Sequence, residues 1–258
     1  MEIELCEPKK ITVVFEKTAS HNVDPEKGFT PICPDELPVP EGDEIVPELQ
    51  GQNKLAKYKT FSKDIHPANA IWIASKMNPQ FTPVKGKNVD IRWNLHCASG
   101  TMGSELLDGL NVLDYDFFVA KGFEPDMHPY SSCYHDLEKK ISTGLIEWYQ
   151  ANEISTIILG GLATNYCVGE TAIDLVNAGF QVILNLGACR GIGTNQEIED
   201  YINMLVEKYN VIIVDSYTEI ETESQINSQE DYILVCCNCG FEAKNLVEFN
   251  DHNKQGCD

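Results

Sequence analysis

Short β-branched runs alternate with longer helical patterns from residue 55 onward, and this alternation limits the fold more than any other feature of the chain. The strand-like runs are Lys57–Phe61, Asp116–Ala120, Thr156–Leu159, Gln181–Leu184 and Asn210–Val214. Between them, apolar residues recur at spacings of three and four, as in helices, over Asp136–Gln150, Cys167–Ala178 and Asn195–Tyr209. We therefore predict an α/β protein with three layers, α-β-α, around a mostly parallel central sheet.

The amino-acid composition indicates the cellular compartment and argues against nucleic acid as a binding partner. The chain has 258 residues, of which 43% are hydrophobic, so it can bury a sizeable core. Its formal charge of −21 repels phosphate backbones, and nucleic-acid binding is not expected. We find neither an apolar run long enough to span a membrane nor a secretory signal. Four of the ten cysteines lie in the last 23 residues, which in a reducing compartment indicates metal binding. We expect a cytoplasmic protein.

The pattern predicts a large domain followed by a small one. Residues 30–47 are rich in proline and acidic side chains and are typical of an irregular loop. Residues 217–230 are polar and lack periodicity, as expected for a linker. We predict a main domain over residues 1–216 and a cysteine-rich module over residues 231–258.

Polar residues follow several predicted strands, where open parallel sheets carry their sites. Four such places stand out: Asp24 after TASHNV, Asp64 and His66 after KYKTFS, Lys121 after DFFVA, and GGLATNYC after TIIL. These places hold the candidate functional residues.

Cys167 lies between a strand and the helix that follows it, which suits a nucleophile. A helix N-terminus lowers the pKa of a thiol and favours the thiolate, and its N–H groups can hold an oxyanion. The alternative is a buried cysteine that packs as a small hydrophobic residue. Gly160 and Gly161 favour the functional interpretation, because glycine permits close approach and unusual backbone angles.

A thiol nucleophile needs a proton acceptor, and Asp24 is placed to serve as one. Lys121 could raise the acidity of the thiol and keep Asp24 ionised. Each has an ordinary alternative, Asp24 as a turn or capping residue and Lys121 as a solvated strand end. Three strand ends that supply Cys, Asp and Lys together make a functional site the better interpretation.

The ordered motifs DPEKGF, DIH, WNLHC, AKG and GLATNYCVGETA resemble those of nicotinamidases, within the isochorismatase-like cysteine hydrolases. The resemblance covers residues 20–216 and implies the isochorismatase-like fold. It implies that Cys167 is the nucleophile, Asp24 the general base and acid, and Lys121 the assisting charge. It also implies a cis peptide at Leu162–Ala163 and an oxyanion hole formed by the N–H groups of Ala163 and Cys167.

The resemblance also implies a divalent metal site. Asp64 and His66 are two residues apart in an extended segment, and His96 would supply a third ligand. From spacing alone we would favour a chance tripeptide. A carboxylate with two imidazoles and open positions suits Zn, Fe or Mn. In this type of family member the pyridine nitrogen and waters complete the shell.

Two departures from the family pattern concern this region. Some relatives have another histidine six residues after the DxH histidine, where this chain has Trp72. Relatives usually carry glutamine where this chain has Glu26, and that extra acid could raise the pKa of Asp24 by like-charge repulsion.

Three aromatic residues are candidates for substrate binding. Phe29 and Trp93 match family positions that flank the pyridine ring, and Tyr130 would line the same mouth. Flat aromatic walls suit a flat heteroaromatic amide. The alternative is that these side chains only pack in the core.

The tail has the spacing of a small ββα zinc finger of the C2HC type. Its predicted ligands for a structural zinc ion are Cys236, Cys239, His252 and Cys257, with Cys237 as an alternative to Cys236. Residues 231–258 carry five acidic side chains and two lysines, a net charge of −3, whereas DNA-binding fingers need basic helices. We therefore expect a structural module or a protein contact, including a contact within a homo-oligomer.

Together these features predict an enzyme that hydrolyses the small molecule nicotinamide to nicotinate and ammonia through a cysteine thioester. One alternative is a hydrolase of another small amide in the same superfamily. Another is an inactive hydrolase domain that serves as a zinc-finger adaptor.

Overall fold

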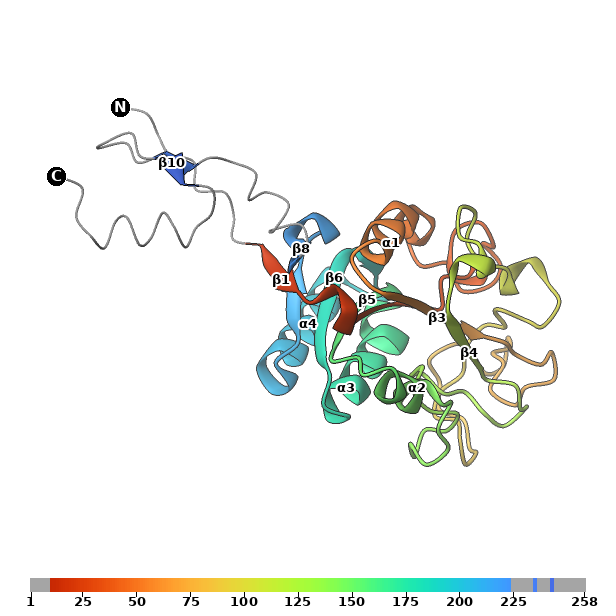
Figure 1. Ribbon diagram of the computed structural model, residues 1–258. Coiled ribbons are helices and arrows are strands. Elements are labelled where there is room, and N and C mark those ends of the chain that lie inside the picture. Colours follow the sequence, from red (N-terminus) through yellow and green to blue (C-terminus); the bar gives the residue numbers. More distant parts are fainter. Residues whose placement is uncertain (1–9, 224–233, 236–241, 244–258) are drawn as a thin grey trace.

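The computed structural model describes residues 10–223, 234–235 and 242–243 (Figure 1). Its centre is a six-stranded sheet in which every neighbouring pair is parallel, in the order β4-β3-β2-β5-β6-β7. The strands are β2 (Thr18–Val23), β3 (Tyr58–Asp64), β4 (Phe117–Lys121), β5 (Thr156–Leu162), β6 (Gln181–Arg190) and β7 (Ile212–Val214). The predicted parallel α/β fold is confirmed.

The inner strands are buried on both faces, which explains why they read as continuous apolar runs. In β5, Ile157 and Leu159 join the core on one face, whereas Ile158 joins a separate cluster on the other. Figure 1 shows α1 (Val46–Asn53) above the sheet and α2 (Leu145–Ala151) and α3 (Gly169–Asn177) below it. The helices α3 and α4 (Asn195–Tyr209) pack against each other. Helices on both faces complete the three layers.

Helix α4 begins and ends where the sequence pattern places it. Thr194 accepts a hydrogen bond from the backbone N–H of Glu197, and the Glu197 side chain accepts one from the backbone N–H of Thr194. This reciprocal capping fixes the first turn.

The helix predicted over residues 136–150 is wrong in its first half. Lys139 and Gly144 have positive φ values of 57° and 89°, which a right-handed helix excludes. The Asp136 carboxylate accepts hydrogen bonds from the N–H groups of Lys140 and Ile141 and stabilises a turn instead. The helix therefore begins only at Leu145.

Shorter helical turns occupy the connections between strands. They are η1 (Phe15–Lys17), η2 (Lys27–Phe29), η3 (Gly42–Ile45), η4 (Met102–Ser104), η5 (Val112–Asp114), the π-helical η6 (Thr164–Val168) and η7 (Tyr217–Glu219). The predicted loop over residues 30–47 is thus irregular except for η3 and the start of α1.

The segment predicted as a linker begins with regular structure. Strand β8 (Ile220–Thr222) pairs in parallel with β1 (Ile11–Val13), so the main domain extends past residue 216. In the tail, β9 (Leu234–Val235) and β10 (Glu242–Ala243) are antiparallel. The predicted zinc ligands Cys236, Cys239, His252 and Cys257, and Cys237, lie outside the described residues.

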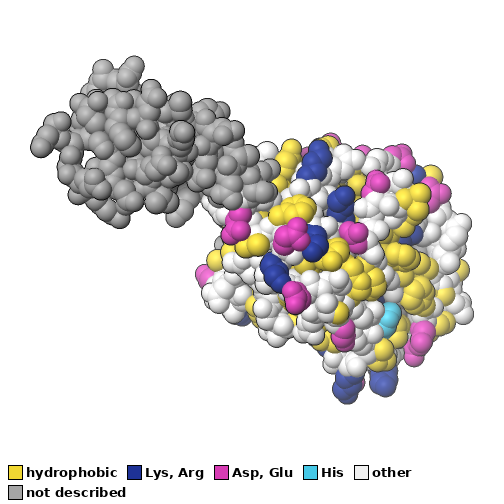
Figure 2. Space-filling model, in the orientation of Figure 1, with side chains coloured by type: hydrophobic (Ala, Val, Ile, Leu, Met, Phe, Trp, Pro, Cys, Tyr) yellow, Lys and Arg dark blue, Asp and Glu magenta, His cyan; other side chains and the backbone are white. Residues whose placement is uncertain are grey.

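Charges of opposite sign alternate over the face in Figure 2, where Lys and Arg lie beside Asp and Glu rather than gathering in a basic patch. Among the described residues, no helix has the length and apolar character needed to cross a membrane.

Candidate active site

Four neighbouring strands place the candidate catalytic residues at one edge of the sheet. Lys121 ends β4, Asp64 ends β3, Asp24 follows β2, and Cys167 lies five residues after β5. Asp64 and Lys121 are directly paired in the β3–β4 register. Because the carboxyl ends of parallel strands lie at the same edge, residues far apart in the chain converge there.

The Lys121 ammonium is the centre of the cluster. Its Nζ atom lies 3.0 Å from Asp24 Oδ2, 2.5 Å from Asp64 Oδ1 and 3.7 Å from Cys167 Sγ. Cys167 Sγ also lies within 4.8 Å of a carboxylate oxygen of Asp24. The structure therefore brings the predicted thiol, carboxylate and ammonium within reach of one another.

A chain of hydroxyl groups orients Asp24. Ser62 Oγ donates to Asp24 Oδ1 at 2.6 Å, and Ser132 Oγ donates to Ser62 Oγ at 2.8 Å. With Oδ1 held by Ser62 and Oδ2 by Lys121, the carboxylate has one fixed orientation beside the thiol.

Gly161 permits the close approach of β5 to β2 just before Asp24. Its φ is +136°, and a Cβ atom there would lie 2.0 Å from the carbonyl oxygen of Val23. Only glycine fits this backbone conformation and this contact. The glycine pair before the cysteine motif therefore serves the packing that places Asp24 and Cys167 together.

Cys167 lies in η6, immediately before α3, and the predicted cis peptide at Leu162–Ala163 is present. Burial of Cys167 opposes the expected preference for thiolate. Burial raises the pKa of the Cys167 thiol well above its usual value, and Lys121 only partly opposes this. The thiol thus rests protonated, and catalysis requires a base to remove its proton.

The pKa values of the three ionisable groups around the Cys167 thiol are shifted in different directions. Burial raises the pKa of Asp24, although Lys121 opposes the shift. Burial also opposes ionisation of Asp64, but Lys121 and His66 hold its pKa below the usual value. Burial would lower the pKa of Lys121, yet the two aspartates raise it well above the usual value. Lys121 and Asp64 are therefore charged, whereas Asp24 is the carboxyl group best suited to exchange a proton near neutral pH.

The three predicted metal ligands lie together. His66 Nε2 is 3.5 Å from Asp64 Oδ2, and the ring centroids of His66 and His96 are 4.8 Å apart. The backbone of His66 pairs with residues 97–99, which holds His96 beside it. His66 Nδ1 contacts the carbonyl of Gly122 at 3.1 Å, and His96 Nδ1 contacts that of Asn94 at 2.7 Å. Each ring is thereby oriented through one nitrogen, as in metal-ligating histidines.

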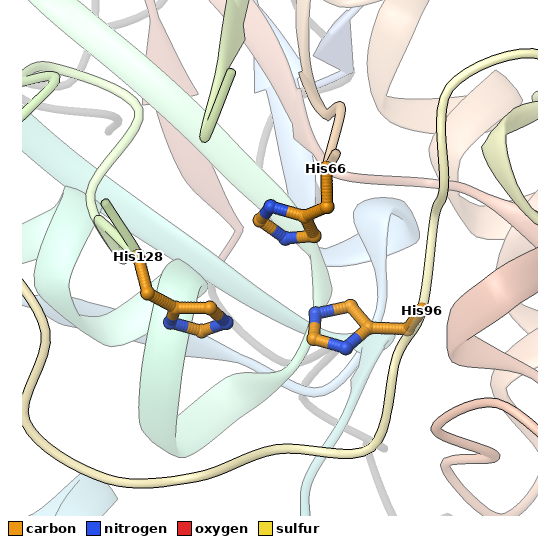
Figure 3. Close-up of side chains that lie close together, drawn as sticks. All are labelled: His66, His96 and His128. Carbon is orange, nitrogen blue, oxygen red and sulfur yellow. The ribbon is translucent and has the colours of Figure 1, made fainter. Parts of the chain in front are cut away.

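A third histidine, His128, joins this pair, as Figure 3 shows. Its ring centroid lies 5.2 Å from that of His66 and 5.6 Å from that of His96. Sequence analysis missed it, because a single histidine in the loop after β4 has no diagnostic spacing. Its only signal was its place two residues before Tyr130, in the loop that follows Lys121.

A narrow pocket opens beside the cysteine and the predicted metal ligands. Phe29, Trp93 and Tyr130, the predicted substrate-binding residues, all line it, and so do Ala163 and Cys167. Trp93 Nε1 donates to the Tyr130 hydroxyl at 3.3 Å, which orients both rings. Other lining residues that the sequence did not reveal are Leu37, Tyr166 and Ile192.

Comparison with known proteins supports the same class of site. The family model of the isochorismatase domain matches residues 23–216. The chain belongs to the isochorismatase family. It is similar to a nicotinamidase of Acinetobacter baylyi, with 30% identity over 180 residues that cover 69% of this chain and 83% of the relative.

Two solved structures of this family show the same fold. A nicotinamidase/pyrazinamidase of Acinetobacter baumanii superposes with a TM-score of 0.72 at 27% identity, covering 79% of this chain and 98% of that one. A pyrazinamidase of Pyrococcus horikoshii, solved in complex with zinc, has a TM-score of 0.61 at 28% identity, covering 77% and 98%.

Glu26, one of the two departures from the isochorismatase-family pattern, lies in surroundings that favour its neutral form, although Lys63 Nζ, 3.9 Å from Oε1, partly opposes this. Burial raises its pKa well above the usual value, and the nearby Asp24 and Asp64 add to the shift. Its Oε2 atom accepts a hydrogen bond from the Asp64 backbone N–H at 2.7 Å. A protonated carboxyl group can occupy the place of a glutamine side chain. Repulsion between the neighbouring carboxylates therefore adds to the rise in the pKa of Glu26 itself.

Proposed function

We propose that this chain is a nicotinamidase, which hydrolyses nicotinamide to nicotinate and ammonia through a thioester on Cys167. The observation that carries the proposal is the contact of one buried ammonium with the thiol and with both aspartates, beside an aromatic pocket. The similarity to nicotinamidases of several organisms supports the same substrate.

Acylation requires a thiolate, and Asp24 takes the proton from Cys167. The sulfur attacks the carboxamide carbon, and the carbonyl oxygen becomes an oxyanion. The N–H groups of Ala163 and Cys167 hold that oxyanion, as in other acyl-transfer sites. Asp24 then gives its proton to the departing amine, the C–N bond breaks, and ammonia leaves a nicotinoyl thioester.

In deacylation, Asp24 carries a proton from water to the sulfur of Cys167. Asp24, again ionised, takes a proton from a water molecule that attacks the thioester carbon. The C–S bond breaks, and the thiolate receives the proton from Asp24 as nicotinate leaves. Lys121 remains charged throughout, because two aspartates raise its pKa. Its role is to stabilise negative charge on the carboxylate and on the sulfur.

The aromatic walls select a flat ring. Phe29 contacts the His96 ring at a centroid distance of 5.0 Å, and Trp93 contacts Tyr130 and Tyr166 in the lining of the same pocket. A pyridine ring between these side chains is removed from water on both faces, and its carboxamide can reach Cys167.

Asp64, His66 and His96 fit a divalent metal ion. Asp64 Oδ2 and His66 Nε2 are buried and have no hydrogen-bond partner among the described residues, as expected of atoms that await a ligand. Burial lowers the pKa of His96 to about 3, so its imidazole is neutral and can donate a lone pair. A bound ion of Zn, Fe or Mn would be held by these residues and would supply Lewis-acid chemistry that could help to hold a pyridine substrate.

The proposal also covers the cysteine-rich tail and the cellular compartment of the protein. The spacing of Cys236, Cys239, His252 and Cys257 supports a C2HC finger, and the first two lie in sequence between the antiparallel β9 and β10. The acidic composition favours a structural role or a protein contact over DNA binding. The clustered cysteines favour the cytoplasm.

The direct test is ammonia release from nicotinamide by the purified full-length chain. Replacing Cys167 with alanine should lower kcat/KM by roughly 10⁴- to 10⁶-fold, the range for loss of a nucleophile. Removal of the metal with a chelator should also abolish turnover, and readdition of a divalent ion should restore it.

Cys133→Ala is the matched control. Cys133 is also a buried free thiol, but it packs in the core beneath the sheet and does not line the pocket. It should keep nearly full activity. Turnover by Cys167→Ala at the wild-type rate, or no turnover of nicotinamide by the wild type, would overturn the proposal.

A further inference from the structure

The three imidazoles of Figure 3 come from three separate segments. His66 follows β3, His96 lies in the long connection between β3 and β4, and His128 lies in the loop after β4. One ring nitrogen from each lies within 4.8 Å of those of the other two. Three ligands at tetrahedral angles with metal–nitrogen bonds of 2.0–2.1 Å lie about 3.3 Å apart, so the rings must rotate toward one another to close the set, His66 and His128 from a stacked arrangement.

His128 differs from the other two because neither of its ring nitrogens has a hydrogen-bond partner among the described residues. The side chain is buried, with 3% of the residue exposed. Burial of an unpaired polar group is unfavourable, so buried polar atoms normally have a partner. His66 and His96 each use one nitrogen for a carbonyl contact, whereas His128 uses none. A bound ion would satisfy one of these nitrogens.

Trp72 holds the segment that carries His128. Its Nε1 atom donates to the carbonyl of Met127 at 3.0 Å, and its ring contacts His128 edge-on at a centroid distance of 4.5 Å. The N–H of His128 itself donates to the carbonyl of Asn88 at 2.8 Å. Indole nitrogen donates a hydrogen bond but offers no lone pair to a metal. Trp72 therefore does not bind the ion but positions a histidine that can.

We propose that His128 is a fourth protein ligand of the divalent ion, beside Asp64, His66 and His96. The proposal rests on the metal site assigned above and adds one imidazole to it. A set of three imidazoles and one carboxylate favours Zn or Fe over Mn, because imidazole suits the former and carboxylate-rich sites suit Mn. His128, in the loop after β4, thus provides the third imidazole, because position 72 of this chain is a tryptophan and not a histidine.

The competing role for His128 is that of an aromatic wall. Its ring is nearly parallel to that of Trp93, with centroids 5.9 Å apart, and it lines the pocket. A wall would need no metal contact, so a direct observation of the imidazole nitrogens separates the two roles.

The test follows the histidine ring nitrogens of the full-length wild-type chain, labelled with ¹⁵N, by NMR as Zn²⁺ is added to the metal-free protein. Metal binding to a ring nitrogen moves its resonance strongly. Among the six histidines, those of His66, His96 and His128 should shift together at one equivalent of the catalytic zinc, and His21 and His135 should not. Shifts of His66 and His96 without His128 would overturn the inference and keep the metal site. No shift of His66 or His96 would overturn the metal site itself.

A variant tests the same ligand by affinity. His128→Ala should weaken Zn²⁺ binding at this site by tenfold or more, as loss of groups around metal sites typically costs 10–100-fold. Added imidazole should enter the vacated space and restore binding. The matched control His135→Ala should bind zinc as the wild type does, because His135 lies outside the cluster. An unchanged zinc affinity of His128→Ala would contradict the proposal.

Discussion

Two buried polar clusters in this protein differ in whether their hydrogen bonds are satisfied from within. The first, which we call the support network, joins α1 to the sheet through Ser20, Asn22, Gln52, Asn53 and Asn185. Gln52 Nε2 donates to Ser20 Oγ at 3.2 Å and to Asn22 Oδ1 at 3.0 Å, and Gln52 Oε1 accepts from Asn185 at 3.1 Å. Its members bond mainly to one another, as expected of a structural network, and among their buried side-chain atoms only Asn185 Oδ1 has no hydrogen-bond partner within the described residues.

The second cluster is the metal site, where buried atoms have no such partners. Asp64 Oδ2, His66 Nε2 and both ring nitrogens of His128 have no hydrogen-bond partner among the described residues. The difference teaches that burial of polar groups alone does not indicate function in this fold. Buried polar atoms that have no hydrogen-bond partner and converge on one point do indicate function. Changes in the support network should therefore cost stability, and changes at the catalytic edge should cost activity.

Among the variants that test this comparison, the largest effect is expected for Asp24→Asn. The amide cannot take the proton from Cys167, so kcat/KM for nicotinamide should fall by roughly 10²- to 10⁴-fold, the usual contribution of a general base. The midpoint of thermal unfolding should change little, since Ser62 and Lys121 retain other partners. Ammonia release and calorimetry on the same preparation check both parts. Nearly full activity of Asp24→Asn would contradict the view that the catalytic edge serves activity and the support network serves stability.

Gln52→Leu should have the opposite profile. The change removes the donor to the buried Asn22 Oδ1 and one acceptor of Asn185 Nδ2, and the free energy of unfolding should fall by about 1–3 kcal/mol. The value of kcat/KM should stay near that of the wild type, because Gln52 does not line the pocket. Denaturant titration and ammonia release measure the two quantities. A loss of activity in a stably folded variant would show that the two clusters are coupled.

His21 should make the folded protein sensitive to acid. Burial lowers its pKa to about 3, so the folded state keeps it neutral while the unfolded chain takes up a proton below pH 6.5. Stability is therefore lost as the pH falls from 6.5 toward 3, by about 1.4 kcal/mol per pH unit from this residue. His21→Gln should remove that share of the slope between pH 6.5 and 5.5 in denaturant titrations. An unchanged slope would mean that His21 is also protonated when folded.

The smallest effect is expected for Glu26→Gln. Because the surroundings of the buried Glu26 favour its neutral form, glutamine can keep the hydrogen bond to the Asp64 N–H, and kcat/KM should stay within about twofold. Glu26→Ala removes that acceptor and should reduce activity more. A large change with glutamine would show that the charge of Glu26 takes part in catalysis.

The sequence predicted the sheet well, because its strands leave local signals. Strands β5 and β6 are apolar runs, Lys121 ends β4, and Asp24 and Cys167 follow β2 and β5. Helix α1 left no such signal. Gln52 and Asn53 lie buried against the sheet, so its inward side is partly polar and its apolar periodicity is weak.

The remaining differences depend on contacts that a linear pattern does not contain. The early start predicted for α2 followed apolar spacing, but Asp136 bonds to two backbone N–H groups in a turn. The protonated resting state of Cys167 depends on full burial, which outweighs Lys121. His128 joins the metal ligands through pairing of its backbone with Asn88 and the contact with Trp72.

The central claim is that Cys167 carries the acyl group during turnover. Rapid acid quenching of the wild-type enzyme with nicotinamide, followed by mass spectrometry of its peptides, tests it most directly. The account predicts one nicotinoyl group on the peptide that contains Cys167, and none in Cys167→Ala. Steady release of ammonia with no adduct on Cys167, or with an adduct on another residue, would contradict it.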